Sequence, residues 1–299
     1  MLASTGKIEE PVTHWRFRDV LPMEAPTFLR WQAMLEERIG IVLPAERKSF
    51  LLTTLAVRMR ELGVDDYDEY FNLLAVRGQG TIEWETLVDR LTVHETRFYR
   101  DCAGLDLVRN AYLANMQAPA GRAVRVNAWS VGCATGEEPY SLAMMLHQYL
   151  GAREGEYYVG ITATDISMAS LATARRGVYH RNRLKNLPAE LLREYFDPVD
   201  IDHYKVSEAI RERVCFTRLN LLELATAPVG KMDIIFCQNV LIYFKRELRI
   251  EILDHLAAHL LPGGLLVLGA GEVVGWRHAG LEPVSRGDVL AFRRLRGTS

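Results

Sequence analysis

The segment Ser130-Val-Gly-Cys-Ala-Thr-Gly-Glu-Glu-Pro-Tyr-Ser141 is a glycine-containing turn between two regular elements. Residues Val124–Val131 are mostly apolar and predict a strand that leads into the turn. Residues Pro139–Leu150 predict a strong helix that leads out of it. Gly132 and Gly136 allow the backbone to turn tightly and to approach a ligand closely. Ligands of open α/β sheets bind beyond the carboxyl ends of the strands, so we expect a ligand at this turn.

Strands and helices alternate on the carboxyl side of this turn. Further apolar runs predict three strands: Tyr157–Thr164, Met232–Cys237 and Leu265–Leu268. Two helices are predicted between them: Ser167–Arg176, and about Glu247–Leu261, which stops at Pro262-Gly-Gly264. This alternation favours an α/β fold, a doubly wound, mainly parallel sheet with helices on both faces. Residues Arg181 to Val214 fit the alternation poorly, and we expect an inserted subdomain there.

The first hundred residues have a helical periodicity instead. Apolar residues recur at helical spacing in four segments, which are 25–39, 45–62, 67–74 and 81–93. Pro44 suits the first turn of the second helix and Gly63 its end, while Asp65-Asp66 can cap the third. We therefore expect a small all-α domain over residues 1–92, followed by an α/β domain over residues 93–299.

Composition restricts the class of protein. The chain has 299 residues, 49% of them hydrophobic, and a formal net charge of -2, which argues against charge-driven binding of nucleic acid. No apolar run approaches the roughly 20 residues that cross a bilayer, and the first residues do not resemble a signal peptide. We therefore expect a cytoplasmic protein that does not insert into the membrane. The four cysteines form no CxxC pair, so no metal site is expected.

The turn favours one class of cofactor over another. It lacks the GxGxxG pattern of dinucleotide enzymes, and Glu137 and Glu138 stand where a pyrophosphate would meet the start of the helix. Two carboxylates would repel a pyrophosphate but would favour S-adenosylmethionine (SAM), which carries a sulfonium, an ammonium and no phosphate. The alternative is that both residues only complement the helix dipole, an effect of about 0.3–1 kcal/mol each.

Asp165 follows the second predicted strand. Its distance from the turn is roughly that at which an acidic residue meets ribose hydroxyls in doubly wound folds. A carboxylate there can accept two hydrogen bonds from the diol. The alternative is that it caps the following helix.

Three segments together resemble one family, the CheR-type methyltransferases that esterify chemoreceptor glutamates. Leu91–Asp101 resembles the family's LTxNxTxFFR element, Ser130–Ser141 its STGEEPYS element and Phe236–Phe244 its FCRNVxIYF element. Their order and spacing agree over about residues 25 to 290. Four departures point to a divergent branch: His94 for Asn, Cys133-Ala134 for Ala-Ser, Gln238 for Arg, and Gly269-Ala-Gly-Glu272 for GHSE.

The resemblance implies a class I SAM methyltransferase fold, SAM as cofactor and S-adenosylhomocysteine as product. It implies these cofactor-binding residues: His94, Thr96, Arg100, Glu137, Asp165, Asn220, Leu221, Asn239 and Val240. Arg100 and Tyr243 are the expected catalytic residues, the first beside the substrate carboxylate and the second beside the reacting methyl group. The alternatives are that Arg100 is only a surface arginine and that Tyr243 is only a buried structural residue.

The implied chemistry agrees with the residues present. Glutamate has a pKa of about 4.3, so it is ionised at neutral pH and needs no general base. The sequence has no evident Ser/His/Asp or Cys/His arrangement. Catalysis would then consist mainly of positioning, for which the planar fork of an arginine is well suited.

The helical domain is expected to recognise the substrate. Arg47 and Arg58 are eleven residues apart, about three helical turns, and are predicted to share a face that meets the cytoplasmic helices of a chemoreceptor. A solvated helix face is the alternative. Two rival functions remain open, namely a SAM-dependent methyltransferase of another substrate and a SAM-binding regulator without turnover.

Overall fold

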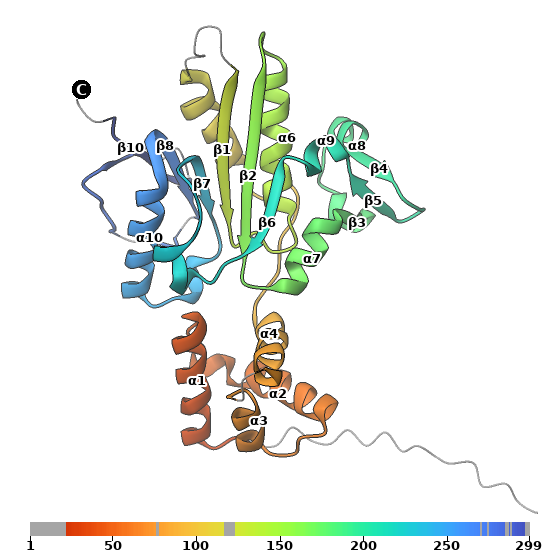
Figure 1. Ribbon diagram of the computed structural model, residues 1–299, viewed down its shortest axis with the longest axis vertical. Coiled ribbons are helices and arrows are strands. Elements are labelled where there is room, and N and C mark those ends of the chain that lie inside the picture. The colour runs from red at the N-terminus through yellow and green to blue at the C-terminus, as the bar shows by residue number, and fades with distance from the viewer. Residues whose placement is uncertain are drawn as a thin grey trace, which may run out of the picture.

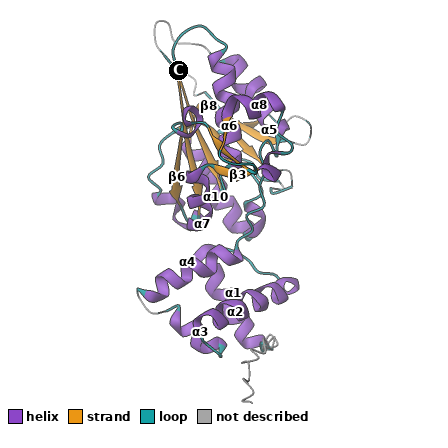
Figure 2. Ribbon diagram, turned by 90° about the vertical axis from the view of Figure 1, so that its right-hand side faces the viewer, coloured by secondary structure: helices purple, strands orange, loops and turns teal. Residues whose placement is uncertain are grey.

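The computed structural model describes residues 22–75, 78–116, 123–269, 271–273, 275–284, 287 and 289–296. A helical part lies below an α/β part in Figure 1, and the strands are confined to the α/β part in Figure 2. The helical part consists of α1 (Ala25–Ile39), the 3₁₀ turn η1 (Ala45–Arg47), α2 (Lys48–Leu62), α3 (Tyr67–Leu73) and α4 (Gln79–Leu91). The expected small all-α bundle before the sheet is therefore confirmed.

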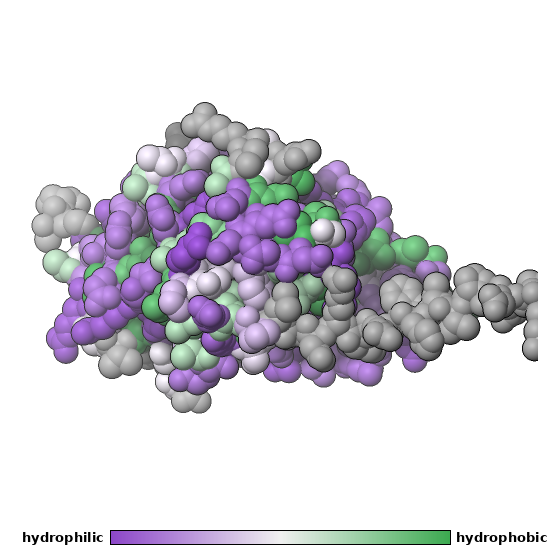
Figure 3. Space-filling view, turned by 90° about the horizontal axis from the view of Figure 1, so that it is seen from below, coloured by the Kyte–Doolittle hydropathy of each residue, from purple (hydrophilic) through white to green (hydrophobic). Residues whose placement is uncertain are grey.

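Local signals end and begin these helices, as predicted for Gly63 and for Asp66. Gly40 and Gly63 follow α1 and α2 with φ of +73° and +71°, a left-handed conformation that glycine adopts without strain. The carboxylate of Asp66 accepts the amides of Asp68 and Glu69 at the start of α3, at 3.2 and 3.0 Å. The helices pack around Trp31, whose ring is fully buried. Seen from below in Figure 3, hydrophilic residues dominate this end of the molecule, with smaller hydrophobic areas between them.

The α/β part contains a seven-stranded sheet in the order β6-β2-β1-β7-β8-β10-β9. Its strands are β1 (Val124–Val131), β2 (Tyr157–Asp165), β6 (Val214–Arg218), β7 (Met232–Cys237), β8 (Leu260–Leu268), β9 (Leu281–Pro283) and β10 (Leu290–Arg294). The pairs β6–β2, β2–β1, β1–β7 and β7–β8 are parallel, and β10 is antiparallel to both of its neighbours. The predicted mainly parallel sheet is confirmed.

Helices cover both faces of the sheet, so it is doubly wound. On β1, Val126 and Ala128 pack toward α6 (Glu137–Gly151), whereas Trp129 and Val131 belong to a second core with α10 (Arg246–His259). Figure 1 shows α6 and α10 on opposite sides of β1. The other helices of this part are α5 (Cys102–Leu107), which continues into a π-helical turn (Val108–Tyr112), and α7 (Met168–Arg176).

One predicted boundary is wrong. The last helix ends at His259 rather than Leu261, and Pro262-Gly-Gly264 lies inside β8 instead of after the helix. The pairing of β7 with β8 shifts register between Met232 and Ile234, and this irregularity accommodates the proline. A Cβ atom on Gly264 would lie 2.9 Å from the carbonyl oxygen of Asp233, so this position requires a glycine.

The segment that interrupts the alternation carries a sheet of its own. The strands β3 (Val178–His180), β4 (Phe196–Pro198) and β5 (His203–Val206) form an antiparallel sheet in the order β3-β5-β4. The same segment contains the 3₁₀ turn η4 (Arg181–Leu184), α8 (Ala189–Tyr195) and α9 (Glu208–Arg211). This small sheet lies beside α6 and β6 at the right of Figure 1. Its aromatic residues Tyr179 and Phe196 join the core around α6.

Within the described ranges, no helix is both long enough and apolar enough to span a bilayer. The same ranges contain no cluster of three or more residues suited to hold a metal ion. Cys133 and Cys237 are buried, and Cys102 and Cys215 are exposed.

Candidate active site in the interdomain cleft

A cleft lies where the helical part meets the carboxyl ends of β1, β2 and β7. It consists of two pockets. One lies beside the helical part, and the other lies beside the linker between α4 and α5 (residues 92–101). Four residues line both pockets, so the two pockets are adjacent: Val93, Gly132, Ala134 and Asn239. Because the glycine turn lies at this junction, the ligand site predicted from the sequence coincides with the cleft.

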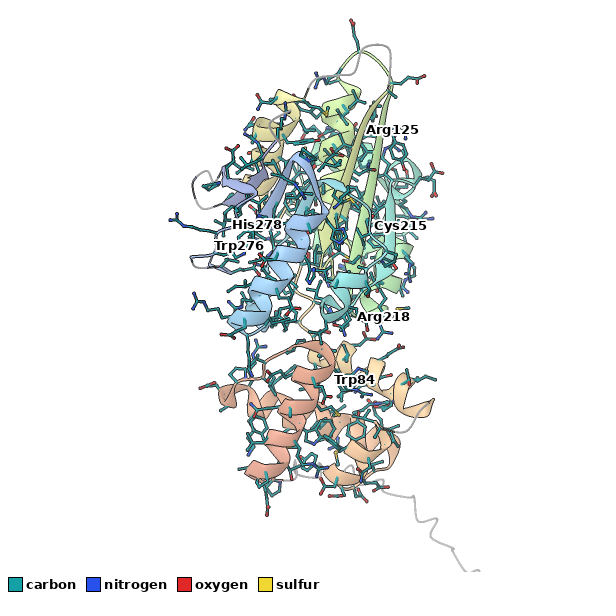
Figure 4. The ribbon with its side chains drawn as sticks, turned by 60° about the vertical axis from the view of Figure 1, so that its left-hand side comes forward. Trp84, Arg125, Cys215, Arg218, Trp276 and His278 are labelled. Atoms are coloured by element: carbon teal, nitrogen blue, oxygen red, sulfur yellow. The ribbon has the colours of Figure 1, made fainter. Side chains whose placement is uncertain are left out.

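Contacts between the two parts fix the width of the cleft. The amide of Val42 donates to the carbonyl of Tyr243 at 2.8 Å, and Ile41 forms an antiparallel bridge with Phe244. Additional bonds run from Asn220 Nδ2 to the carbonyl of Arg38 (2.8 Å), from Arg218 to Glu85 and from Lys245 to Glu36. Figure 4 shows Arg218 at the lower edge of the α/β part, above Trp84 of α4. The helical part therefore forms one wall of the cleft.

The glycine turn approaches its neighbours too closely for side chains. Gly132 has φ +69°, and a Cβ atom there would lie 2.3 Å from Val240 Cγ2. Gly136 has φ +95°, and its Cβ atom would lie 2.8 Å from that of Ala174. Both glycines are therefore required by conformation and by space together.

Asp165 closes the turn from the second strand. Its carboxylate lines the first pocket and accepts the amides of Ala134 at 2.8 Å and Ser167 at 2.9 Å. Burial raises the pKa of this carboxyl group, and the two amide bonds oppose the rise. The N-cap of α7 is Ser167, whose hydroxyl accepts the amide of Ser170 at 3.0 Å. The capping alternative for Asp165 is therefore not what the structure shows.

The two glutamates after the turn point in different directions. Glu137 is fully buried, binds Thr135 Oγ1 at 2.6 Å and Arg183 at 3.0 Å, and lines neither pocket. Glu138 lines the second pocket and accepts a hydrogen bond from Ser130 Oγ at 2.7 Å. Burial raises the pKa of Glu138 to about 7. Of these two glutamates, Glu138 is therefore the one that lines the cleft, whereas the expected cofactor-binding residue, Glu137, lies behind the turn and lines neither pocket.

The linker after α4 supplies three of the expected residues. His94 lines the first pocket, and its Nε2 atom lies 2.9 Å from Thr92 Oγ1. Thr96 and Arg100 line the second pocket. The guanidinium of Arg100 donates to the carbonyl of Glu95 at 2.6 Å, which holds it at the rim of the cleft.

The remaining expected residues line the first pocket: Asn220, Leu221, Asn239, Val240 and Tyr243. Asn239 has φ +60°, a conformation that is uncommon outside glycine and that recurs at functional sites. Asn220 uses its amide to join the two parts of the chain and its Oδ1 atom to accept the amide of Leu222 at 3.2 Å.

Glu272 shapes the same region and was missed by the sequence analysis. Its carboxylate is buried and accepts the amides of Gly269 at 2.8 Å and Leu241 at 3.0 Å. The amides of Asn239 and Val240 also lower its pKa, against the rise caused by burial. The only signal in the sequence was that Glu272 matches the last residue of the GHSE element, which did not by itself indicate this role.

Arg47 and Arg58 do not form the common recognition surface that was predicted, because their side chains have different surroundings. Arg47 lies in the 3₁₀ turn before α2 and lines the first pocket, beside the α/β part. Arg58 donates to both carboxylate oxygens of Glu83, at 2.7 and 2.5 Å, inside the helical bundle. Glu83 is buried and also accepts the hydroxyl of Tyr70 at 2.6 Å. Arg58 therefore satisfies a buried charge.

Family models match both parts of the chain. Residues 26–92 match the CheR methyltransferase all-alpha domain, and residues 94–289 match the CheR methyltransferase SAM binding domain. A chemotaxis protein methyltransferase from Escherichia coli is 36% identical over 82% of this chain and 83% of its own length. One from Borreliella burgdorferi is 32% identical over 79% of this chain and 83% of its own length.

Solved structures give a weaker likeness. A magnesium protoporphyrin IX methyltransferase from Synechocystis with bound SAM is 16% identical, with a TM-score of 0.36 over 81% of this chain and 96% of its own. An rRNA methyltransferase from Streptomyces viridochromogenes is 12% identical, with a TM-score of 0.41 over 68% of this chain and 87% of its own.

The cleft fits SAM. Asp165 presents a carboxylate suited to a ribose diol, and the first pocket is otherwise walled largely by apolar side chains such as Leu219 and Val240. A partly buried carboxylate, that of Glu138, lines the adjoining pocket and favours a cationic ligand over a phosphate. The family models, the relatives and this geometry agree, and the chain belongs to the CheR family of SAM-dependent methyltransferases.

Proposed function

We propose that this methyltransferase transfers the methyl group of SAM to glutamate side chains of chemoreceptors and thereby forms glutamyl methyl esters. The observation that carries the proposal is the position of Arg100. Arg100 lines a pocket that shares four residues with the proposed cofactor pocket, so a carboxylate bound there would lie beside the cofactor. The names of the relatives, which are chemotaxis protein methyltransferases, and the resemblance of the three motifs support the same substrate.

When bound, SAM supplies an electrophilic methyl group, and S-adenosylhomocysteine is the product. The residues of the chain hold and orient the reactants. Asp165, Asn220 and Leu221 hold the adenosine part, while Arg100 orients the substrate carboxylate. A glutamate with an ordinary pKa of about 4.3 is already ionised at pH 7, so no residue has to remove a proton.

The residues around Arg100 should limit its affinity for the substrate carboxylate. Glu138 lines the same pocket, and its pKa of about 7 gives it a partial negative charge at neutral pH. Because Arg100 lines the same pocket, we propose that this charge weakens the attraction of Arg100 for the substrate carboxylate. A substrate held too tightly in its ground state would gain nothing in turnover, so this competition favours catalysis. Tyr243, which lines the cofactor pocket, is placed to orient either partner through its hydroxyl group.

The test compares methyl transfer by the wild type and by an Arg100→Ala variant. Each is incubated with methyl-labelled SAM and receptor-rich membranes from the protein's own host. We expect base-labile label on a receptor-sized band and loss of at least 90% of it, about 1.4 kcal/mol or more, in the variant. The matched control is Arg109→Ala, because Arg109 is an exposed arginine paired with Asp106 on the surface. It should label the receptor like the wild type.

Two outcomes would contradict the proposal. A wild type that binds SAM but labels no membrane protein would favour a regulator without turnover. Label that resists base, or that appears on another macromolecule, would favour a methyltransferase with a different substrate.

A further inference from the structure

The small antiparallel sheet contacts the back of the cofactor turn. Tyr179 of β3 donates its hydroxyl to the carbonyl of Thr135 at 2.6 Å, inside the glycine turn. Arg183 of η4 forms an ion pair with Glu137, at the start of α6, at 3.0 Å. Glu137 is fully buried, whereas the side chain of Arg183 is 45% exposed, so the arginine reaches inward from the surface to neutralise a buried charge.

The same nitrogen of Arg183 also reaches the linker. Arg183 Nη1 donates to the carbonyl of Thr96 at 3.1 Å. The linker is held near this point by two other contacts. Phe98 packs edge-on against Tyr179 and Phe196, with ring centroids 5.0 and 5.2 Å apart, and the amide of Tyr99 donates to Ser141 Oγ at 2.9 Å. The linker segment is therefore fastened to the small sheet and to α6 at once.

These contacts matter because of what the linker carries. Thr96 and Arg100 both line the second pocket, where the substrate carboxylate is proposed to bind. Arg183 lines neither pocket itself. A displacement of about 1 Å at a reacting group can reduce turnover by roughly a hundredfold, so an indirect contact of this kind can matter for catalysis.

We propose that Arg183 is a positioning residue for methyl transfer, which joins the carbonyl of Thr96 to Glu137 and so sets where the linker places Arg100 in the cleft. Its effect on turnover rests on the proposed function, whereas its effect on the linker does not. Arg183 acts from outside the pocket, and its loss should change the second pocket more than the first. Turnover should therefore respond more strongly than cofactor affinity.

The experiment measures turnover, cofactor affinity and linker exchange in one set of variants. For Arg183→Ala we expect kcat to fall roughly tenfold or more, while the Kd for S-adenosylhomocysteine changes less than about threefold. In the complex with S-adenosylhomocysteine, the backbone amides of residues 92–101 should exchange hydrogen several-fold faster in Arg183→Ala than in the wild type. The matched control is Arg181→Ala, since Arg181 lies in the same 3₁₀ turn but pairs at the surface with Asp202. It should leave all three quantities unchanged.

Two more variants separate positioning from stability. Arg183→Lys keeps the positive charge beside Glu137 and should recover part of kcat. In Arg183→Ala the carboxylate of Glu137 is left buried without a cation, so the melting temperature should fall. Adding Glu137→Gln removes that charge and should restore the melting temperature, yet kcat should stay low because nothing holds the carbonyl of Thr96.

The proposal would be overturned if kcat and melting temperature recovered together in the double variant, or if Arg183→Ala matched Arg181→Ala in turnover and in linker exchange. If the wild type methylates no receptor, the proposed function fails. The exchange measurement then still decides whether Arg183 holds the linker.

Discussion

The carboxylate of Asp165, the last residue of β2, accepts the backbone amide of Ala134 at 2.8 Å and joins the second strand to the glycine turn after the first. The amide of Ser167, at 2.9 Å, holds the other carboxylate oxygen. Both oxygens are therefore oriented before a ligand arrives, which reduces the ordering that binding requires. The group that we assign to the ribose is also a structural element of the turn.

Asp165→Asn should weaken binding of S-adenosylhomocysteine by about tenfold or more, or about 1.4 kcal/mol. The amide group of asparagine would direct its NH2 toward one of the two backbone amides that now donate to the carboxylate. Isothermal titration calorimetry measures the change. Asp200→Asn is the control, because Asp200 is an exposed aspartate outside both pockets. Equal affinity in the two variants would remove Asp165 from the cofactor site.

Glu138→Gln should change the pH dependence of stability. Burial raises the pKa of Glu138 from 4.5 to about 7, so its contribution to stability is fully present below pH 4.5 and is lost as the pH rises to about 7. Glutamine does not titrate and avoids this loss. Between pH 5 and pH 8, the free energy of unfolding of the variant should therefore gain about 1–3 kcal/mol relative to the wild type.

Urea unfolding at the two pH values tests this shift. Asp165 and Glu272 also have raised pKa values, but they are common to both proteins and cancel in the difference. Glu190→Gln serves as the control, since Glu190 is exposed on α8. A difference between Glu138→Gln and wild type that is independent of pH would mean that Glu138 titrates normally.

The parts of the site that were predictable are those carried by local sequence. The turn between β1 and α6, and Asp165 at the end of the next strand, follow from the period of the apolar residues and from the geometry of parallel sheets. Glu272 was not predictable, because its carboxylate accepts the amide of Leu241, 31 positions earlier in the sequence. The two residues meet because β7 and β8, which precede them, are neighbours in the sheet. Arg183 likewise reaches Thr96 across 87 positions.

Arg58 shows why a helical periodicity cannot assign a charge. The spacing that predicts a solvent-facing arginine equally suits one that faces a neighbouring helix, and only the packing of α2 against α4 decides between them. A second error concerns the end of α10. Pro262-Gly-Gly264 is a sequence typical of helix termination, but it lies within β8.

Arg58→Ala should lower the free energy of unfolding by about 3–5 kcal/mol, because it leaves the carboxylate of Glu83 buried without its cation. Arg58→Met combined with Glu83→Gln should recover most of that loss. Arg30→Ala is the control, since its ion pair with Asp68 is exposed and should contribute at most about 1 kcal/mol. Chemical denaturation measures all three. If Arg58→Ala were as stable as the wild type but failed to methylate receptors, Arg58 would belong to the recognition surface after all.

Gly132→Ala should abolish cofactor binding through backbone strain and a steric clash together. Gly63→Ala is the control that carries the backbone strain alone. Both glycines have a left-handed φ, +69° and +71°, so both substitutions carry a strain of about 1–2 kcal/mol. A Cβ atom at Gly63 meets nothing within 4 Å, whereas one at Gly132 would lie 2.3 Å from Val240 Cγ2. Relief of that clash must move either the turn or Val240, and both line the cofactor pocket.

Binding of S-adenosylhomocysteine should therefore be lost in Gly132→Ala and unchanged in Gly63→Ala, although both variants melt at a lower temperature than the wild type. A third variant, Val240→Ala in the Gly132→Ala background, removes the clashing methyl group and should restore part of the affinity. If it restores none, the loss arises from backbone strain rather than from contact with Val240. If Gly132→Ala binds like the wild type, the cofactor does not approach the turn as closely as we propose.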